Sequence, residues 1–309
     1  MYQKIKPPNL TSYFLLLAFW AITACDYIDT PIPVTPDVGD TASCSTPAFL
    51  VNPTPVRKVL VEDYTGHTCP NCPKATDSLK NIIISYPEQA IGVSVHYSAA
   101  FAAPQPGLGG DPNAFISDFR TNAGTTWGDF FMAGAGLPNG TINRMSYTVT
   151  ATTHRKLYTS WKSLVQQQLA KPVTADIQIK SEFNPADSNA CIAVNTKFLL
   201  DTSGTFKLVV LMTQDSIIDW QYDSRASPSV YVQNYIHRHV MRDNISSEWG
   251  DNLASGSITS GYEKTIKYKY KIKAAYNNIA CDINKCHLVA YLYDPANYEV
   301  MQAEEIKIK

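Results

Sequence analysis

The fold is decided by the stretch VRKVLVEDYTGHTCPNCP, residues 56–73. Its first half is an apolar run that suits a buried strand, and its second half places Cys69 and Cys72 with two residues between them. Apolar residues at 79–84 then mark one face of a helix, and residues 90–97 form another apolar run. The sequence therefore predicts a strand, a CxxC motif, a helix and a second strand, with the two strands parallel in one sheet.

The spacing of Cys69 and Cys72 is typical of thiol–disulfide exchange. The backbone N–H groups and the dipole at a helix N-terminus favour a thiolate, so Cys69 is expected to be the nucleophile and Cys72 the resolving cysteine. Pro138, which precedes a later extended segment, is the third candidate residue of this site. Glu62 and Asp63 end the strand before the motif. We expect solvent to reach them there, although a buried carboxylate could relay a proton to the resolving cysteine.

The same motif fits two other roles. His67, Cys69, Cys72 and His96 could together hold a tetrahedral metal ion, but an exported CxxC pair meets oxidising conditions, and a structural zinc usually has two clear ligand pairs. The cysteines could also form a purely structural disulfide in a binding protein. Covalent haem attachment is excluded because Pro73 stands where that motif needs a histidine. We therefore assign no metal and no cofactor to the chain.

Two further segments complete a first domain over residues 56–172. Residues 98–137 are rich in Ala, Gly, Pro and aromatic residues, and they are expected to form an insertion over the sheet, with a helix at about 111–120. Apolar side chains between residues 157 and 169 follow one helical face and predict the helix that closes this domain.

The apolar period changes from helical to two after Pro172. Several short alternating segments predict that residues 173–309 form an all-β antiparallel sandwich. The stretch 214–262 lacks clear alternation and is expected to be a long loop. His237 and His239 within it could bind a metal together, but a structural or surface role is expected because no carboxylate or third histidine is near in sequence.

Charge is nearly balanced over the whole chain, with 26 Lys and Arg residues against 27 Asp and Glu residues. No dense basic run is present, so a nucleic-acid partner is not expected. Lysines alternate with apolar residues at 266–273, which indicates a solvated sheet face that discourages edge pairing, or else a surface for an anionic ligand.

The first residues predict export and a lipid anchor. Residues 1–24 read as a lipoprotein signal peptide, because two lysines precede an apolar stretch too short to span a bilayer. The small residues before Cys25 make it the expected lipidation site, through which the protein would bind a membrane. Residues 25–55 are rich in Pro and Thr and are expected to be an extended tether.

Four cysteines remain after these assignments. Cys281 and Cys286 are close in sequence and are candidates for a structural disulfide, which would leave Cys44 and Cys191 as a pair. Four cysteines allow three pairings, and the sequence does not choose among them.

The motifs resemble two known groups of proteins. A CxxC motif after a strand, with Pro138 before a later strand, is similar to the thioredoxin-like superfamily, in which a cis-proline beside the motif helps to bind the substrate backbone. Residues 65–73, 137–144 and 231–242, the last followed by Trp249-Gly250, resemble the outer membrane protein 28 family of Bacteroidota lipoproteins. This resemblance implies a cell-envelope location at the outer membrane, facing the periplasm or the cell surface, and a thioredoxin-like domain joined to a β-rich domain.

We therefore expect an α/β thioredoxin-like domain followed by an immunoglobulin-like sandwich. The leading functional hypothesis is thiol–disulfide exchange on an envelope protein or peptide by a lipoprotein held to the membrane through Cys25. The alternative is a non-enzymatic surface or periplasmic binding or adhesion lipoprotein, in which Cys69–Cys72 is only a structural disulfide.

Overall fold

The computed structural model of the protein describes residues 44–45, 47–146 and 154–309. The predicted signal peptide at 1–24 and the predicted lipidation site Cys25 lie outside the described residues, as does most of the predicted tether. Among the described residues, no helix combines the length and the apolar character needed to cross a bilayer.

The strand–helix–strand unit predicted from residues 56–97 is confirmed. Strands β1 (Val59–Thr65) and β2 (Ala90–His96) pair in parallel over their whole length, and helix α2 (Cys72–Ser85) connects them. Every residue of both strands is buried, which explains why their sequences are apolar runs without alternation.

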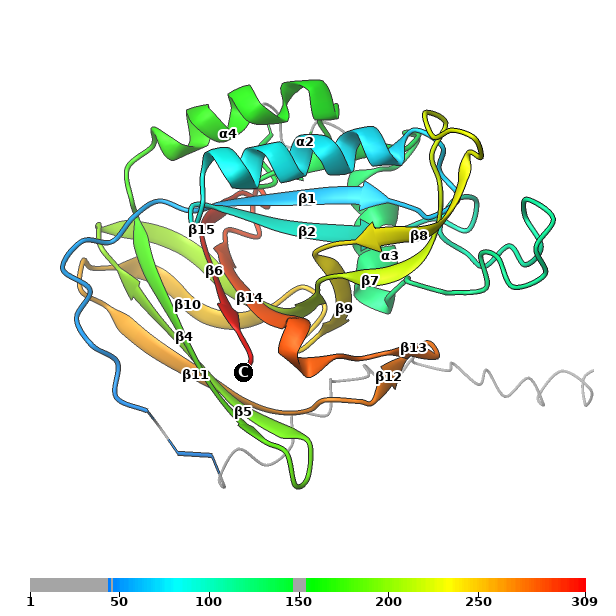
Figure 1. Cartoon of the computed structure of the whole chain (residues 1–309). Helices are drawn as coiled ribbons and strands as arrows, with labels where there is room; N and C mark the ends of the chain where they lie inside the picture. The colour runs from blue at the N-terminus through cyan, green and yellow to red at the C-terminus, as the bar shows by residue number, and fades with distance from the viewer. Residues whose placement is uncertain (1–43, 46, 147–153) are drawn as a thin grey trace, which may run out of the picture. The chain divides into compact units, whose positions relative to one another are not determined.

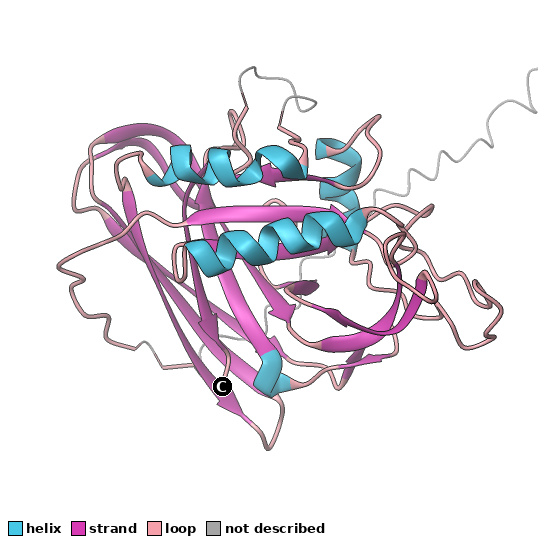
Figure 2. Cartoon of the chain, turned by 45° about the horizontal axis from the view of Figure 1, so that its top comes forward, coloured by secondary structure: helices cyan, strands magenta, loops and turns pink. Residues whose placement is uncertain are grey.

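Helices cover both faces of these strands. Helix α2 and helix α4 (Trp161–Leu169), preceded by the short η3 (Tyr158–Ser160), pack on one face, as Figures 1 and 2 show. Helix α3 (Asn122–Phe131) packs on the other face. The helix expected at 111–120 is not formed: its residues make turns and extended chain, and α3 begins later because Thr121 accepts a hydrogen bond from the backbone N–H of Gly124 (3.0 Å).

Both halves of the chain contribute strands to one eight-stranded sheet. Its further strands are β3 (Asn139–Ile142), β6 (Thr202–Gln214), β9 (Val240–Asn244), β10 (Asp251–Ile258), β14 (Cys286–Tyr293) and β15 (Val300–Lys307). The order is β15-β14-β6-β9-β2-β1-β3, with β10 paired to β6. The two halves meet where Ser94 of β2 pairs with Val240 of β9, a continuity that the sequence pattern did not indicate.

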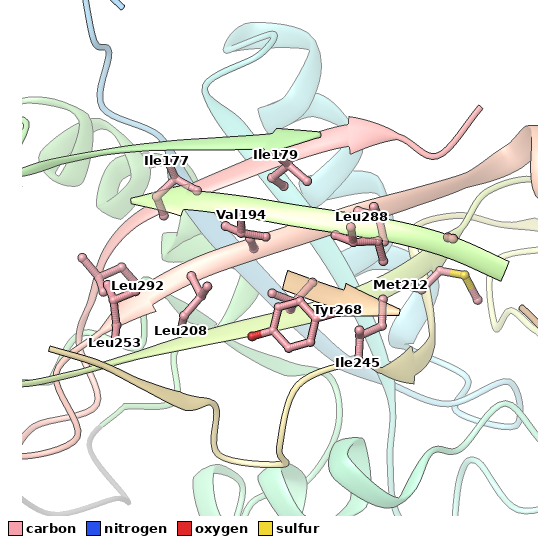
Figure 3. Close-up of a cluster of buried hydrophobic side chains, with 14 of the residues drawn as sticks. Ile177, Ile179, Val194, Leu208, Met212, Ile245, Leu253, Tyr268, Leu288 and Leu292 are labelled. Carbon is pink, nitrogen blue, oxygen red and sulfur yellow. The ribbon is translucent and has the colours of Figure 1, made fainter. Parts of the chain in front are cut away.

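A second sheet of three strands packs against the C-terminal part of the first. It has the order β11-β5-β4 and consists of β4 (Ala175–Asn184), β5 (Asn189–Phe198) and β11 (Glu263–Lys271). Figure 3 shows the buried side chains between the two sheets, among them Ile177, Val194, Tyr268, Leu208, Met212 and Leu288. The predicted β-rich part with facing sheets is thus confirmed.

The segment predicted as one long loop at 214–262 instead contains four strands. Besides β9 and β10 these are β7 (Ile217–Tyr222) and β8 (Tyr231–His237), which form a separate hairpin. The hairpin lacks a clean period of two because Ile218 and Ile236, paired across the strands, are both exposed. A second small hairpin, β12 (Ala275–Tyr276) with β13 (Ile279–Ala280), and the short η4 (Ile283–Lys285) precede β14.

Candidate functional site

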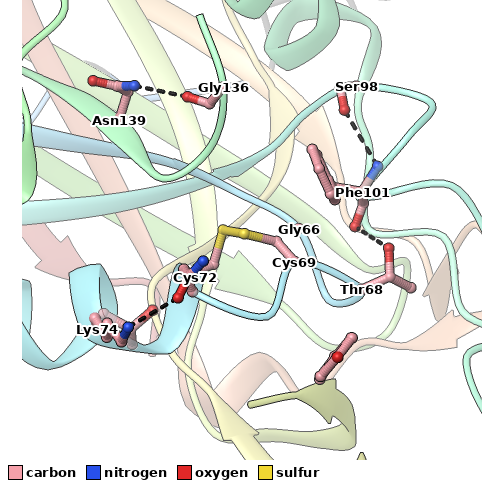
Figure 4. The surroundings of a disulfide bond; sticks show 12 residues. Gly66, Thr68, Cys69, Cys72, Lys74, Ser98, Phe101, Gly136 and Asn139 are labelled. Carbon is pink, nitrogen blue, oxygen red and sulfur yellow. Dashed lines mark hydrogen bonds between the residues drawn. A yellow bond between two sulfur atoms is a disulfide. The ribbon is translucent and has the colours of Figure 1, made fainter. Parts of the chain in front are cut away.

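A disulfide joins Cys69 and Cys72 at the N-terminus of α2. Cys72 is the first residue of the helix, and Cys69 lies in the loop between β1 and α2, as the sequence predicts. Both cysteines are only 1% exposed. Figure 4 shows the Asn139–Gly136 hydrogen bond to one side of the disulfide and the Phe101–Thr68 hydrogen bond to the other.

Pro138 lies at the same end of the sheet as the disulfide. The peptide bond between Leu137 and Pro138 is cis, and the proline is buried. Asn139, the next residue, opens β3 and pairs antiparallel with Tyr64, near the end of β1 that leads into the CxxC loop. The fold thus brings Pro138 and the CxxC motif together although about 65 residues separate them.

Glu62 and Asp63 are both fully buried, so the expectation that solvent reaches them was wrong. They are buried because β1 is an interior strand, between β2 and β3, with helices on both of its faces. Glu62 pairs with Arg144. Asp63 has one contact from Thr76 Oγ1 to Oδ2 (3.4 Å), while its Oδ1 has no partner among the described residues. Burial, partly opposed by the Thr76 contact, raises the pKa of Asp63 to about 7.

Asp63 lies beside the first turns of α2. Thr76 follows Cys72 by four residues on this helix, so the two side chains lie on the same helix face. The Asp63 carboxyl group, which contacts Thr76, therefore lies on the same face of α2 as Cys72. A buried carboxyl with a pKa near neutrality can accept or donate a proton at this point.

A loop from the predicted insertion holds one side of the motif. The carbonyl oxygen of Phe101 accepts hydrogen bonds from the backbone N–H (3.0 Å) and the hydroxyl (2.9 Å) of Thr68. A Cβ atom on Gly66 would lie 2.2 Å from the same oxygen, so only glycine allows this approach.

The β7–β8 hairpin holds the other side of the motif. The Gln221 side-chain amide lies 3.4 and 3.2 Å from the carbonyl oxygens of Gly66 and Cys69, in position to donate to both. Backbone N–H groups of Tyr222 and Ser224 donate to the carbonyl oxygens of His67 (2.8 Å) and Pro70 (3.0 Å). A segment more than 150 residues away in sequence therefore binds four carbonyl groups of the CxxC loop.

Two side chains of the hairpin segment also contact α2. Arg225 forms an ion pair with Asp77 of the helix (2.7 Å). Burial raises the pKa of Tyr235 to about 12, and its hydroxyl is close enough to interact with Thr76 and Asp63. The hairpin thus spans the first two turns of the helix as well as the CxxC loop.

Three buried histidines surround the ring of Phe119, and they come from β2, β8 and the loop after β1. The ring centroids of His67, His96 and His237 lie 5.8, 4.7 and 4.9 Å from that of Phe119. Burial lowers the pKa of His67 and of His237 to about 4, and that of His96 well below its usual value. At neutral pH the three imidazoles are therefore uncharged.

The residues considered as metal ligands do not form a ligand set. In the part of the chain that the structure describes, no group of three or more His, Cys, Asp or Glu side chains is arranged to hold a metal ion. The sulfur atoms of Cys69 and Cys72 are bonded to each other. His239 lies apart from His237, with its backbone N–H donating to Asp215 (2.7 Å).

The other cysteines pair only in part as the sequence suggested. Cys44 and Cys191 form a disulfide. Cys281 and Cys286 are in contact, with their sulfur atoms 3.5 Å apart, but they are free thiols, so the disulfide expected there is not formed.

Sequence reasoning missed the β7–β8 hairpin as part of the site. A signal for it existed in the block 231–242, which we noted as a motif but could not connect with the CxxC loop. Its position follows from hydrogen bonds between distant backbone groups, which leave no periodic pattern in the sequence.

Comparisons with known proteins identify one family and one similar fold. A family model described as outer membrane protein Omp28 matches residues 130–309, whereas no curated protein matches the sequence. HBP35 of Porphyromonas gingivalis is a structural neighbour with a TM-score of 0.58 and 15% identity, over 82% of this chain and 76% of that one. Identity this low shows a shared fold and no more.

Two further solved structures are less similar. A structural-genomics protein from Agrobacterium tumefaciens has a TM-score of 0.49 and 13% identity, over 83% of this chain and 96% of that one. A domain of the outer membrane lipoprotein Omp28 from Porphyromonas gingivalis has a TM-score of 0.31 and 16% identity, over 45% of this chain and 91% of that one.

Proposed function

Because the chain belongs to the Omp28 family of outer membrane proteins, we propose that it is an envelope lipoprotein whose Cys69–Cys72 pair exchanges disulfides with envelope proteins. The family assignment gives the location at the outer membrane. The family match begins at residue 130, after the CxxC motif, so the chemistry is argued from the site itself. Attachment through a lipid on Cys25 is part of the proposal.

The observation that carries the redox proposal is the buried carboxyl group of Asp63 beside the first turns of α2. A buried carboxyl with one oxygen unsatisfied and a pKa near 7 costs stability, and a purely structural disulfide does not require such a group, whereas proton transfer to a resolving cysteine does. The cis-proline at 138 and the CxxC pair at a helix N-terminus add to this, and together they support a thioredoxin-like arrangement for residues 56–172. For residues 173–309 we propose an immunoglobulin-like sandwich, which is supported by the two sheets that face each other across a buried core.

The proposed reaction begins from the oxidised pair. A thiolate of the substrate attacks Sγ of Cys69, which forms a mixed disulfide and releases Cys72 as a thiolate. Asp63 donates its proton to this thiolate. A second substrate thiolate then attacks the substrate sulfur of the mixed disulfide and releases Cys69 as a thiolate. The substrate dithiol is thereby oxidised to a disulfide, and the CxxC pair is reduced to a Cys72 thiol and a Cys69 thiolate, with Asp63 left as a carboxylate; the opposite direction uses the same steps in reverse.

Burial of the disulfide favours a second candidate function. With Cys69 and Cys72 each 1% exposed, no substrate sulfur reaches them unless a neighbouring segment moves, and the β7–β8 hairpin and the loop at Phe101 are the segments bonded to the CxxC loop. If no such segment moves, the disulfide is structural, and the alternative is a binding or adhesion lipoprotein. The two functions differ in a measurable property, which is turnover.

Trapping of a mixed disulfide tests the proposal. A Cys72→Ser variant keeps the nucleophile Cys69 but cannot release a bound partner, so it is expected to accumulate mixed disulfides with a disulfide-bonded peptide or with disulfide-bonded envelope proteins, as the Cys69 thiolate attacks one sulfur and the other leaves as a thiolate. Wild-type protein is expected to reduce the same peptide, or to oxidise its dithiol form, with turnover. A Cys286→Ser variant, which changes a thiol outside the motif, serves as the matched control and is expected to trap nothing. If there is no turnover and no trapped partner, the exchange proposal is wrong, and the disulfide is structural.

A further inference from the structure

The outer face of the β11-β5-β4 sheet carries a concentration of lysines. Strand register places Lys180, Ala193 and Lys267 side by side on this face, and Glu182, Cys191 and Lys269 in the next row. Five lysines lie on this face, and the neighbouring acidic residues are fewer and include one residue of the β4–β5 turn. The lysines are Lys180, Lys197, Lys267, Lys269 and Lys271, and the acidic residues are Asp176, Glu182, Asp187 and Glu263. The opposite face of the sheet is the apolar core, so the lysine face points outward.

The N-terminal segment of the described chain lies along this lysine face. Cys44 is bonded to Cys191 in the middle strand of the sheet. Lys180 Nζ donates to the carbonyl oxygen of Ala48 (2.6 Å), and the side-chain amide of Gln178 donates to that of Leu50 (3.0 Å). The part of the predicted tether near Ala48 and Leu50 is therefore held against β4.

This segment presents apolar side chains to solvent beside the lysines. Leu50 is 79% exposed and Val51 is 82% exposed, more than any other large apolar side chain among the described residues. Phe49 lies next to them, with Lys180 Nζ 5.5 Å from its ring centroid. Apolar side chains bordered by lysines are typical of surfaces that rest in the interface of a bilayer, where the apolar groups enter the acyl boundary and the ammonium groups remain at the phosphates.

We propose that this lysine face, with Leu50 and Val51, is the surface by which the folded protein rests on an anionic lipid layer. The position of the tether supports lipid as the occupant. Residues 26–43 lie between the predicted lipid on Cys25 and the disulfide at Cys44, which corresponds to at most about 65 Å of extended chain. The segment that would carry the lipid thus joins the described fold at this face, at Cys44, and phosphate headgroups complement its lysines.

The inference is independent of the redox chemistry of Cys69 and Cys72, and it uses the proposed lipid anchor only to locate the tether. Figures 1 and 2 place the N-terminal segment and the β7–β8 hairpin at opposite sides of the described fold. A bilayer against the lysine face would therefore leave the CxxC site directed away from the lipid.

Vesicle binding by the mature chain without its lipid tests the proposal. Residues 26–309 are expected to sediment with vesicles of phosphatidylcholine and phosphatidylglycerol and to be released from them by high salt. They are expected not to bind vesicles of phosphatidylcholine alone. The Lys180→Gln/Lys269→Gln/Lys271→Gln variant is expected to lose binding by about tenfold or more. A Leu50→Ser/Val51→Ser variant is expected to weaken binding to the same vesicles by several-fold.

The matched control removes the same charge from another surface. In the Lys80→Gln/Lys162→Gln/Lys171→Gln variant the substituted residues lie on or just after α2 and α4, and its binding is expected to stay within about twofold of wild type. Thermal unfolding of each variant shows whether it is folded. Equal losses in the two triple variants, or no binding of the wild type to anionic vesicles, would overturn the proposal. Redox turnover is not involved in any of these measurements.

Discussion

The guanidinium of Arg144 donates two hydrogen bonds to the carboxylate of Glu62, at 2.8 and 2.6 Å, in a fully buried ion pair. The rings of Trp127, Phe131 and Tyr291 surround the guanidinium, with their centroids 4.7, 4.7 and 5.0 Å from its central carbon. Burial is the largest single influence and would lower the pKa of Arg144, but the charge and hydrogen bonds of Glu62, together with Tyr291 and Tyr64, outweigh it, and the pKa is raised. This pair joins β1 to the turn after β3, to α3 and to β14.

Removal of the Glu62 charge is therefore expected to destabilise the protein strongly. In a Glu62→Gln variant the guanidinium of Arg144 stays buried without its counter-charge, which is expected to lower the free energy of unfolding by about 3–5 kcal/mol. Urea unfolding measures the change. Asp77→Asn, which breaks the exposed pair with Arg225, is the control and is expected to cost less than about 1 kcal/mol. Similar losses in the two variants would contradict the assigned role of the buried pair.

Asp63 is expected to make stability fall as pH rises. The pKa of Asp63 is about 7 in the folded protein and about 3.8 for an ordinary, exposed aspartate, so between these pH values the folded state holds a proton that the unfolded state has lost. An Asp63→Asn variant should therefore gain stability over wild type as pH rises from about 4 to 7. The full gain is expected to be on the order of 4 kcal/mol above pH 7. A gain that stays the same from pH 4.5 to pH 8 in urea unfolding would show that Asp63 ionises normally.

His67 is expected to have the opposite pH dependence. The pKa of His67 is lowered to about 4, mainly by burial and secondly by His237. Between about pH 4 and 6.5 the unfolded state therefore binds a proton that the folded state does not bind. Wild-type stability should then fall as pH drops from about 6.5 towards 4. Neither ring nitrogen has a hydrogen-bond partner among the described residues, and the ring stacks on Phe115.

A His67→Phe variant tests this expectation. It is expected to be more stable than wild type by about 1–3 kcal/mol at pH 7, because a buried unsatisfied polar group is removed. The difference should widen on acidification, since phenylalanine takes up no proton. Thermal unfolding at pH 7 and pH 5 measures both effects. A variant that is less stable at both pH values would mean that His67 has a partner, such as an ordered water.

Gln221 is expected to limit access to the disulfide. Loss of its contacts with Gly66 and Cys69 in a Gln221→Ala variant should make opening of the β7–β8 hairpin easier and speed the reduction of Cys69–Cys72 by dithiothreitol about tenfold. Quenching with maleimide and mass analysis give the rate. Gln178→Ala removes a comparable amide contact on β4 and should leave the rate unchanged. Equal rates for wild type and Gln221→Ala would show that another element controls access.

The first half of the fold could be predicted because its residues follow simple periods. The apolar runs of β1 and β2 and the helical face of α2 follow from local pattern alone, and Cys69 and Cys72 were located with them. The burial of Asp63 could not be read in the same way, because a carboxylate after an apolar run looks the same whether its strand lies at the edge or in the interior of the sheet.

The contacts between distant segments could not be predicted from the sequence, for a related reason. Ser94 and Val240 join the two halves through backbone groups that every residue possesses. The hairpin residues Gln221 and Ser224 bind carbonyl oxygens of the CxxC loop, and a carbonyl carries no residue identity. Such contacts depend on how strands are ordered in space, which period and composition do not encode.

The junction of β2 with β9 also constrains how this protein can evolve. Strands β1 and β2 precede the part that matches the family, yet they continue the same sheet, and their loss would leave β9 with an unpaired edge inside the fold. A lineage can replace Cys69 and Cys72 by substitution but cannot delete the strands around them. We therefore expect relatives that retain this sheet with other residues at the two cysteine positions.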